Sequence, residues 1–187
     1  MSRDDYEFDD SPDRIDRDVV WTFLSELAYW GGWRSRDVVM RQIDASWRVV
    51  GGYHRRTGEM VAFARAVSDG ISLAYLADVF VLPEHRGQRL GTALLGAMIE
   101  HGPGAHFRWM LHTGDAHGLY AKLGFRPPDH TYLERPGRAP GAAPAGDDRR
   151  RGDQHGRQSA ESRARQIPGK VRTASTTAST SASDSAG

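Results

Sequence analysis

The residues that can build a hydrophobic core stop abruptly before the end of this 187-residue chain. All five tryptophans and every Phe, Tyr and Leu precede residue 136, and the rest of the chain has Ile167 and Val171 as its larger aliphatic residues. Such a stretch buries too little apolar surface to offset the conformational entropy that folding removes. We therefore expect one folded domain over residues 1–135 and a disordered, low-complexity basic tail over 136–187.

Charge divides at the same boundary. Residues 1–135 hold 16 Lys and Arg against 19 Asp and Glu, a net charge of −3, whereas the tail holds 9 against 5, a net charge of +4. A basic arm can contact nucleic acid, but this one has no aromatic side chain to stack on bases. A solvated extension that binds no nucleic acid is the favoured interpretation.

Several classes of protein are excluded by what the chain lacks. It has no cysteine, which excludes a disulfide framework, a thiolate metal site and a cysteine nucleophile. Its acidic beginning has no apolar core of a secretory signal, and no run of about 18 apolar residues marks a membrane span. The histidines show no metal-ligand spacing. We expect a soluble, cytoplasmic protein that uses no metal and binds no membrane.

Periodicity predicts a mixed α/β order. Helices are expected over 16–30, 35–45, 88–101 and 116–124, and strands over 47–54, 60–68, 73–82, 107–113 and 131–135. The first two strands form an antiparallel hairpin, the apolar third strand is central, and a helical crossover leads to a parallel fourth strand. The expected fold is an α/β sandwich with a mixed sheet, and the site should lie at the carboxyl end of the central strand.

That strand runs through a short glycine-bearing turn directly into a helix, in the sequence VLPEHRGQRLGTALL at 81–95. The first amides of a helix lack partners within the helix, and its dipole adds partial positive charge there. We expect this corner to bind an anion through Arg86, Gly87, Gln88, Arg89, Leu90, Gly91 and Thr92. A P-loop would need a lysine followed by Ser or Thr, and a dinucleotide site three suitably spaced glycines. Neither is present, so coenzyme A is the remaining candidate.

Two stretches resemble one family. DVFVLPEHRGQRLGTALL (78–95) is similar to the acyl-CoA motif of the GNAT superfamily of N-acetyltransferases, Arg/Gln-x-x-Gly/Ala-x-Gly/Ala, and AHGLYAKLGF (116–125) resembles its second signature. The resemblance covers about residues 5–135 and points to an uncharacterised subgroup. One position departs from the pattern, because Arg89 stands where Gly or Ala is usual. We expect its side chain to point outward and to supply charge to a phosphate.

The resemblance implies a GNAT-like, mostly antiparallel sheet with helices on both faces and splayed central strands. It implies acetyl transfer from acetyl-CoA, the co-substrate, to a primary amine of a small molecule or peptide by direct attack. Backbone groups of Val79, Phe80 and Val81 would bind the pantetheine arm and the acetyl carbonyl, and Thr113 would keep one cofactor hydrogen bond. A non-catalytic acyl-CoA binding or sensing module is the alternative, and a homodimer is left open.

Two residues are the catalytic candidates. Tyr120 matches the family's tyrosine, and a phenol with a pKa of about 10 can protonate a departing thiolate; otherwise it is a core residue. Asp78 lies in an apolar strand, where burial would raise its pKa. It would then accept the proton of the amine or bind the cationic amine. The alternative is a structural ion pair with an arginine such as Arg65.

The acceptor site is less strongly marked. Trp30 and Trp33 flank two glycines and could form a wall for an apolar or aromatic acceptor, although ordinary packing explains them equally well. His112 ends the strand at 107–113 and is a candidate base, with a structural or solvated role favoured. Together with Asp78, the acidic domain favours a cationic acceptor.

Overall fold

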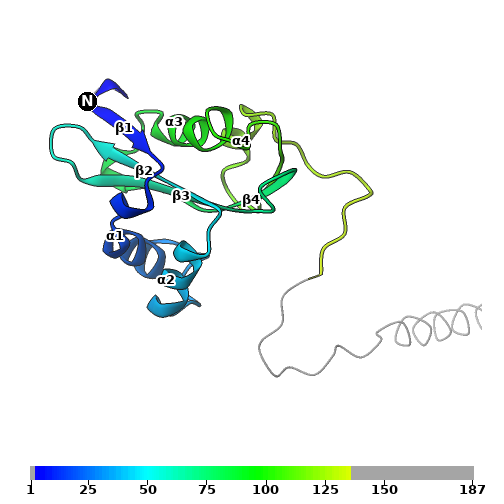
Figure 1. Cartoon of the computed structure of the whole chain (residues 1–187), viewed down its shortest axis with the longest axis horizontal. Helices are drawn as coiled ribbons and strands as arrows, with labels where there is room; N and C mark the ends of the chain where they lie inside the picture. The colour runs from blue at the N-terminus through cyan, green and yellow to red at the C-terminus, as the bar shows by residue number, and fades with distance from the viewer. Residues whose placement is uncertain (1–2, 136–187) are drawn as a thin grey trace, which may run out of the picture. The chain divides into compact units, whose positions relative to one another are not determined.

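The computed structural model describes residues 3–135, of which those up to Thr131 form one compact unit. A five-stranded sheet has the order β1 (Tyr6–Asp9), β2 (Arg48–His54), β3 (Met60–Ser68), β4 (Leu73–Val81) and β5 (Arg108–Met110) (Figure 1). Strands β1 to β4 pair antiparallel, and β5 pairs parallel with β4. The predicted hairpin and the parallel crossover are confirmed.

Helices cover both faces of this sheet, as expected (Figure 1). One face carries α1 (Arg17–Thr22), its π-helical continuation η3 (Phe23–Leu27) and α2 (Arg36–Asp44). The other face carries α3 (Leu90–Leu95), its π-helical continuation η5 (Gly96–Glu100) and α4 (His117–Ala121). Short 3-10 turns η1 (Arg3–Asp5), η2 (Pro12–Arg14) and η4 (Pro83–His85) complete the described elements. The fold is the expected mixed α/β class.

The first two helices begin where side chains satisfy their free amides. A carboxylate oxygen of Asp16 accepts hydrogen bonds from the amides of Asp18 (3.1 Å) and Val19 (3.0 Å). The Ser35 hydroxyl accepts one from the amide of Val38 (3.4 Å). The predicted helix over 16–30 ends early, at Leu27, because Ala28, directly after the π-helical turn, has an extended backbone.

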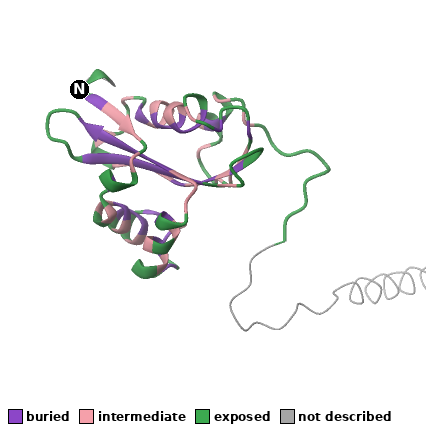
Figure 2. Ribbon diagram, in the orientation of Figure 1, coloured by how far each residue is buried: buried purple, intermediate pink, exposed green. Residues whose placement is uncertain are grey.

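Buried residues form a core on each side of the sheet, and Figure 2 colours the buried parts of the strands and helices purple. Under α1 and α2, Phe23 and Leu24 pack with Phe63 and Phe80. Under α3 and α4, strand β3 contributes alanines, and the helices contribute larger side chains. The main members of this second core are Ala62, Ala64, Ala66, Leu76, Leu94, Leu95 and Met98. The small alanines let α3 approach β3 closely.

The pairing of β3 with β4 contains a bulge. Phe63 pairs with Phe80 and Arg65 pairs with Ala77, so that Ala64 of β3 faces both Asp78 and Val79 of β4. Asp78 has a φ of 49°, in the left-handed region, which aspartate tolerates better than most residues. A bulge of this kind bends its strand and increases its twist.

Strands β4 and β5 part soon after they begin to pair. Their register ends where Tyr75 faces Met110, while β4 continues to Val81. Among the described residues, no strand pairs with this side of β4 beyond that point, so its outward backbone groups are available to a ligand. The expected splay of the central strands is therefore confirmed.

Other predictions need correction. β1 was not predicted, since this strand has only four residues and two of them are acidic. The strand expected over 107–113 is confined to Arg108–Met110, and residues 131–135 form no strand. The predicted disordered tail at 136–187 lies outside the described residues. Within residues 3–135, no helix combines the length and apolar character needed to cross a bilayer.

Candidate functional site

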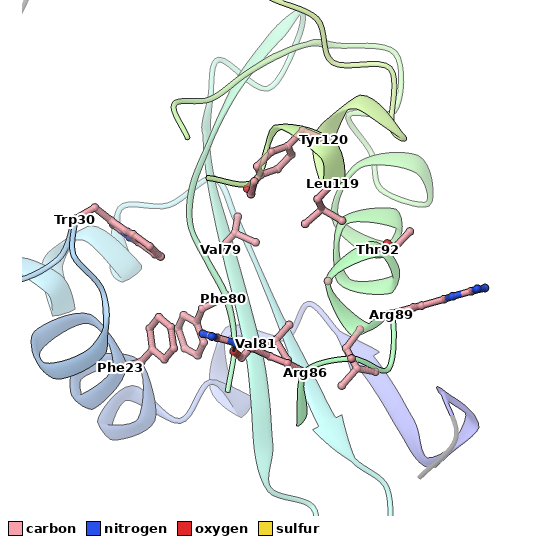
Figure 3. Close-up of a pocket in the computed structure, with 14 residues that line it drawn as sticks. Phe23, Trp30, Val79, Phe80, Val81, Arg86, Arg89, Thr92, Leu119 and Tyr120 are labelled. Carbon is pink, nitrogen blue, oxygen red and sulfur yellow. Dashed lines mark hydrogen bonds between the residues drawn. The ribbon is translucent and has the colours of Figure 1, made fainter. Parts of the chain in front are cut away.

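A cavity of about 320 Å³ lies beside the carboxyl end of β4. Figure 3 shows its two sides, with Trp30 and Phe23 across β4 from α3 and α4. Of the predicted site residues, the cavity brings together Trp30, Val79, Phe80, Val81, Arg86, Gly87, Arg89, Leu90, Gly91, Thr92 and Tyr120. The carboxyl end of the strand is thus where the sequence located the site.

Three lining residues were not predicted as site residues, namely Phe23, Ala116 and Leu119. The ring of Phe23 stacks on that of Phe80 with centroids 4.0 Å apart and planes 9° apart. Phe23 belongs to the apolar face of its predicted helix, and that pattern indicates core packing rather than a place in a functional site. Ala116 and Leu119 belong to the second family signature, and that was the signal available for them.

The turn before α3 lines the cavity and contains two residues with a left-handed backbone. Gly87 has a φ of 80°, and Arg89, the N-cap of α3, has a φ of 60°. Left-handed residues in such a turn orient successive N–H groups to one side and create a concave site for an anion. The exposed side chain of Arg89 extends away from the cavity (Figure 3), in the orientation expected for it.

Arg86 braces this turn against the strand. Its Nε donates a hydrogen bond to the carbonyl oxygen of Val81 at 3.0 Å. The carbonyl oxygen of Val81 is therefore already hydrogen-bonded. The two terminal nitrogens of the Arg86 guanidinium remain available to an anion. Gln88 does not line the cavity, and its buried Oε1 has no hydrogen-bond partner among the described residues.

Tyr120 lies in the cavity wall with 8% of its surface exposed. Burial raises the pKa of its phenol to about 12, with smaller contributions from Asp115 and Tyr29. The ring also packs edge-on against Phe125, with centroids 5.6 Å apart, as a core tyrosine would. Within residues 3–135 its hydroxyl has no hydrogen-bond partner, and it points toward β4 near Val79 (Figure 3). The hydroxyl therefore keeps its proton at neutral pH.

Asp78 has a different environment from the one expected. Arg34 donates from Nη1 to Oδ2 (2.9 Å) and from Nη2 to Oδ1 (2.8 Å), and Arg65 donates from Nε to Oδ2 (2.6 Å). Burial alone would raise the pKa of Asp78, but the hydrogen bonds from Arg34 and the charge of Arg65 outweigh it and hold the pKa below its usual value. The expected raised pKa is wrong, and the alternative ion pair with Arg65 is present.

Three more predicted site residues do not line the cavity. The Thr113 hydroxyl accepts a hydrogen bond from the amide of Ala116 at 3.1 Å, at the start of α4. His112 Nδ1 lies 2.8 Å from the hydroxyl of Tyr75. Trp33 is 78% exposed, and its ring lies 5.7 Å from the guanidinium carbon of Arg34.

Tyr29 joins two loops beside the cavity, and the sequence did not mark it as a site residue. Its hydroxyl accepts a hydrogen bond from the amide of Gly114 at 3.3 Å. Its ring packs edge-on against Trp30, with centroids 4.8 Å apart. The loop after η3 is thereby tied to the loop before α4. Across residues 3–135, no three His, Asp or Glu side chains are grouped to hold a metal ion.

The comparisons with known proteins agree with this geometry. The model of the GNAT acetyltransferase family matches residues 19–125. This chain belongs to the GNAT family. It is also 29% identical over 140 residues to an inferred acetyltransferase of Gibberella zeae, covering 65% of this chain and 78% of that protein.

Solved GNAT structures share the fold. An inferred GNAT acetyltransferase from Xanthomonas campestris pv. campestris is 39% identical, with a TM-score of 0.64 over 70% of this chain and 92% of that chain. An inferred acetyltransferase from Clostridium acetobutylicum, solved with acetyl-CoA, has a TM-score of 0.54 at 14% identity over 70% of this chain and 96% of that one. The second likeness concerns the fold alone. This GNAT chain is therefore an acetyltransferase by family.

Proposed function

We propose that this GNAT protein transfers the acetyl group of acetyl-CoA to a primary amine by direct attack. One observation carries the proposal: a single cavity joins the unpaired edge of β4, the left-handed turn before α3 and the hydroxyl of Tyr120. The fold neighbour from Clostridium acetobutylicum, which was solved with acetyl-CoA, supports the same choice of acetyl donor.

The residues present fit this donor. The amides of the turn around Gly87 and Arg89 would hold its diphosphate, and the free edge of Val79 and Phe80 would hold its pantetheine arm. The bound donor supplies an activated thioester. Phe23 and Trp30 form an apolar wall on the opposite side, where the acceptor would enter.

Tyr120 would act on the leaving sulfur. Because burial raises its pKa to about 12, the phenol is protonated at neutral pH and can donate a hydrogen bond as negative charge develops. Asp78 is held by two arginines with its pKa lowered, so it is a weak base. We therefore assign the removal of the amine proton to water.

The test is release of free thiol from acetyl-CoA by the full chain, with small amines, polyamines, amino acids and peptides as acceptors. Acceptor-dependent release that falls in Tyr120→Phe would support the proposal. Coenzyme A binding without release for any acceptor would favour the alternative, a non-catalytic acyl-CoA sensor.

A further inference from the structure

Two buried arginines share one carboxylate on the face of the sheet that carries α1 and α2. Arg34 is 7% exposed, Arg65 8% and Asp78 9%. Within residues 3–135, Asp78 is the acidic partner of both guanidinium groups. The cluster therefore holds one positive charge in excess. Burying a charge without a counter-charge is unfavourable, so the excess indicates a place for an anion.

Both arginines also have donors to spare. Arg34 donates from Nη1 to Oε1 of Gln42 (2.8 Å), but its Nε is buried and has no hydrogen-bond partner among the described residues. Arg65 donates to Asp78 through Nε, and in the described part of the chain its two terminal nitrogens have no hydrogen-bond partner. Paired N–H groups of a planar guanidinium match the two oxygens of a carboxylate.

The cluster lies close in the chain to two residues that line the cavity, although Arg34, Arg65 and Asp78 do not line it themselves. Asp78 directly precedes Val79, and Arg34 follows Trp30 in the same loop; Val79 and Trp30 both line the cavity. Arg34 also approaches the ring of the exposed Trp33. An acceptor carboxylate would therefore reach the arginines from the side of the cavity that Trp30 and Val79 line.

We propose that the Arg34–Asp78–Arg65 cluster binds a carboxylate of the acceptor, so that the acceptors are amino carboxylates such as amino acids; this rests on the proposed acetyl transfer. One carboxylate neutralises the single excess charge, whereas a phosphate dianion would overcompensate it. The cationic acceptor expected from the acidic composition is disfavoured, because Asp78 is already paired twice.

The test compares L-phenylalanine, L-leucine and β-alanine with their carboxamides, as acceptors for the full chain and for Arg65→Gln. This variant keeps the two-point pair of Arg34 with Asp78. We expect it to raise KM for the acids by about tenfold to hundredfold and KM for the amides by less than about twofold, with the Kd for acetyl-CoA unchanged. Arg65→Lys should restore part of the preference.

A second readout separates this inference from the proposed function. Calorimetry of the same compounds, with the protein saturated with coenzyme A, measures binding without turnover. Tighter binding of acids than of amides, lost in Arg65→Gln, would support the carboxylate site even if no compound were acetylated. Phosphoethanolamine is included in both assays as the phosphate counterpart. The inference is overturned if acids and amides are equivalent in turnover and binding, if neither class binds nor is acetylated, or if phosphoethanolamine is preferred to the acids. Arg41→Gln, at an exposed pair, is the matched control.

Discussion

Arg34 holds both carboxylate oxygens of Asp78, although 44 positions separate the two residues in the chain. The pair fastens the aromatic loop after η3 to the bulge of β4. Trp30 in that loop and Val79 beside the bulge both line the cavity. One ion pair therefore links the loop and the strand that carry two walls of the cavity.

Replacing Asp78 by Asn should lower the free energy of unfolding by about 3–5 kcal/mol, because two buried guanidinium groups lose their counter-charge. Urea denaturation measures the change. Asp37→Asn, which breaks the exposed pair with Arg41, should cost less than about 0.5 kcal/mol. A stable Asp78→Asn protein that lost only turnover would instead restore Asp78 as the base.

Acid should weaken the folded protein partly through the same carboxylate. The pKa of Asp78 is lower in the folded protein than its usual value of 3.8, so its ion pairs stabilise the fold above that value. The stabilisation is lost as pH falls through the folded-state pKa. The difference in unfolding free energy between wild type and Asp78→Asn should therefore be constant above about pH 5 and shrink on further acidification. A constant difference down to pH 2 would contradict this.

Tyr120→Phe should reduce kcat by about a hundredfold or more and leave the Kd for coenzyme A unchanged. The hydroxyl has no partner among the described residues, so the melting temperature should barely move. Since burial raises its pKa to about 12, Tyr120 should produce no alkaline fall in kcat/KM below about pH 10.

Tyr53→Phe is the matched control for that variant. Burial raises the pKa of Tyr53 to about 12 as well, but its hydroxyl donates to the carbonyl of Arg14 at 2.9 Å, and it lies outside the cavity lining. It should cost about 1 kcal/mol of stability and leave kcat unchanged. Equal kcat losses in Tyr53→Phe and Tyr120→Phe would argue against a catalytic hydroxyl.

Gly31→Ala should destabilise the protein by about 1–3 kcal/mol, because a Cβ on Gly31 would overlap the carbonyl group of Leu24. The displaced loop should also carry Trp30 out of the cavity wall and raise KM for the acceptor. Gly32→Ala tests the same loop with open space around the new methyl group. Thermal unfolding of the two variants should differ clearly, and equal melting temperatures would refute this packing.

Arg89→Gly should stabilise the fold by up to about 1 kcal/mol, because Arg89 has a left-handed backbone that favours glycine. Its exposed side chain would act on the diphosphate through charge alone. We expect the Kd for coenzyme A to rise by less than about tenfold at low salt and the difference to disappear at high salt. A large, salt-independent loss would mean that the side chain contacts the ligand directly.

The sequence was most informative where function depends on neighbours in the chain. Glycine spacing and helix periodicity located the turn at Gly87 and the start of α3, and the resemblance to the second family signature marked Tyr120, which lies in the cavity wall. The helix caps Asp16 and Ser35 are equally local, since a cap satisfies amides a few residues away.

Pairings between distant residues were much harder to predict. Nothing in the local sequence indicates that Arg34 pairs with Asp78. Burial alone therefore suggested a raised pKa for Asp78, whereas its two guanidinium partners lower that pKa. Tyr29 likewise reaches Gly114 through a contact between loops. β1 depends on pairing with β2 rather than on its own short, acidic sequence.

The extra residue in β4 opposite Ala64 exchanges the two surfaces of that strand partway along its length. Before it, the even-numbered Leu76 faces α3, whereas after it the even-numbered Phe80 faces α1 and meets Phe23. Deleting one residue there would turn the side chain of Phe80 toward the face covered by α3 and α4. The side chains of Val79 and Val81 would then turn toward α1. Which side chains of β4 face each side of the cavity thus depends on a single inserted position.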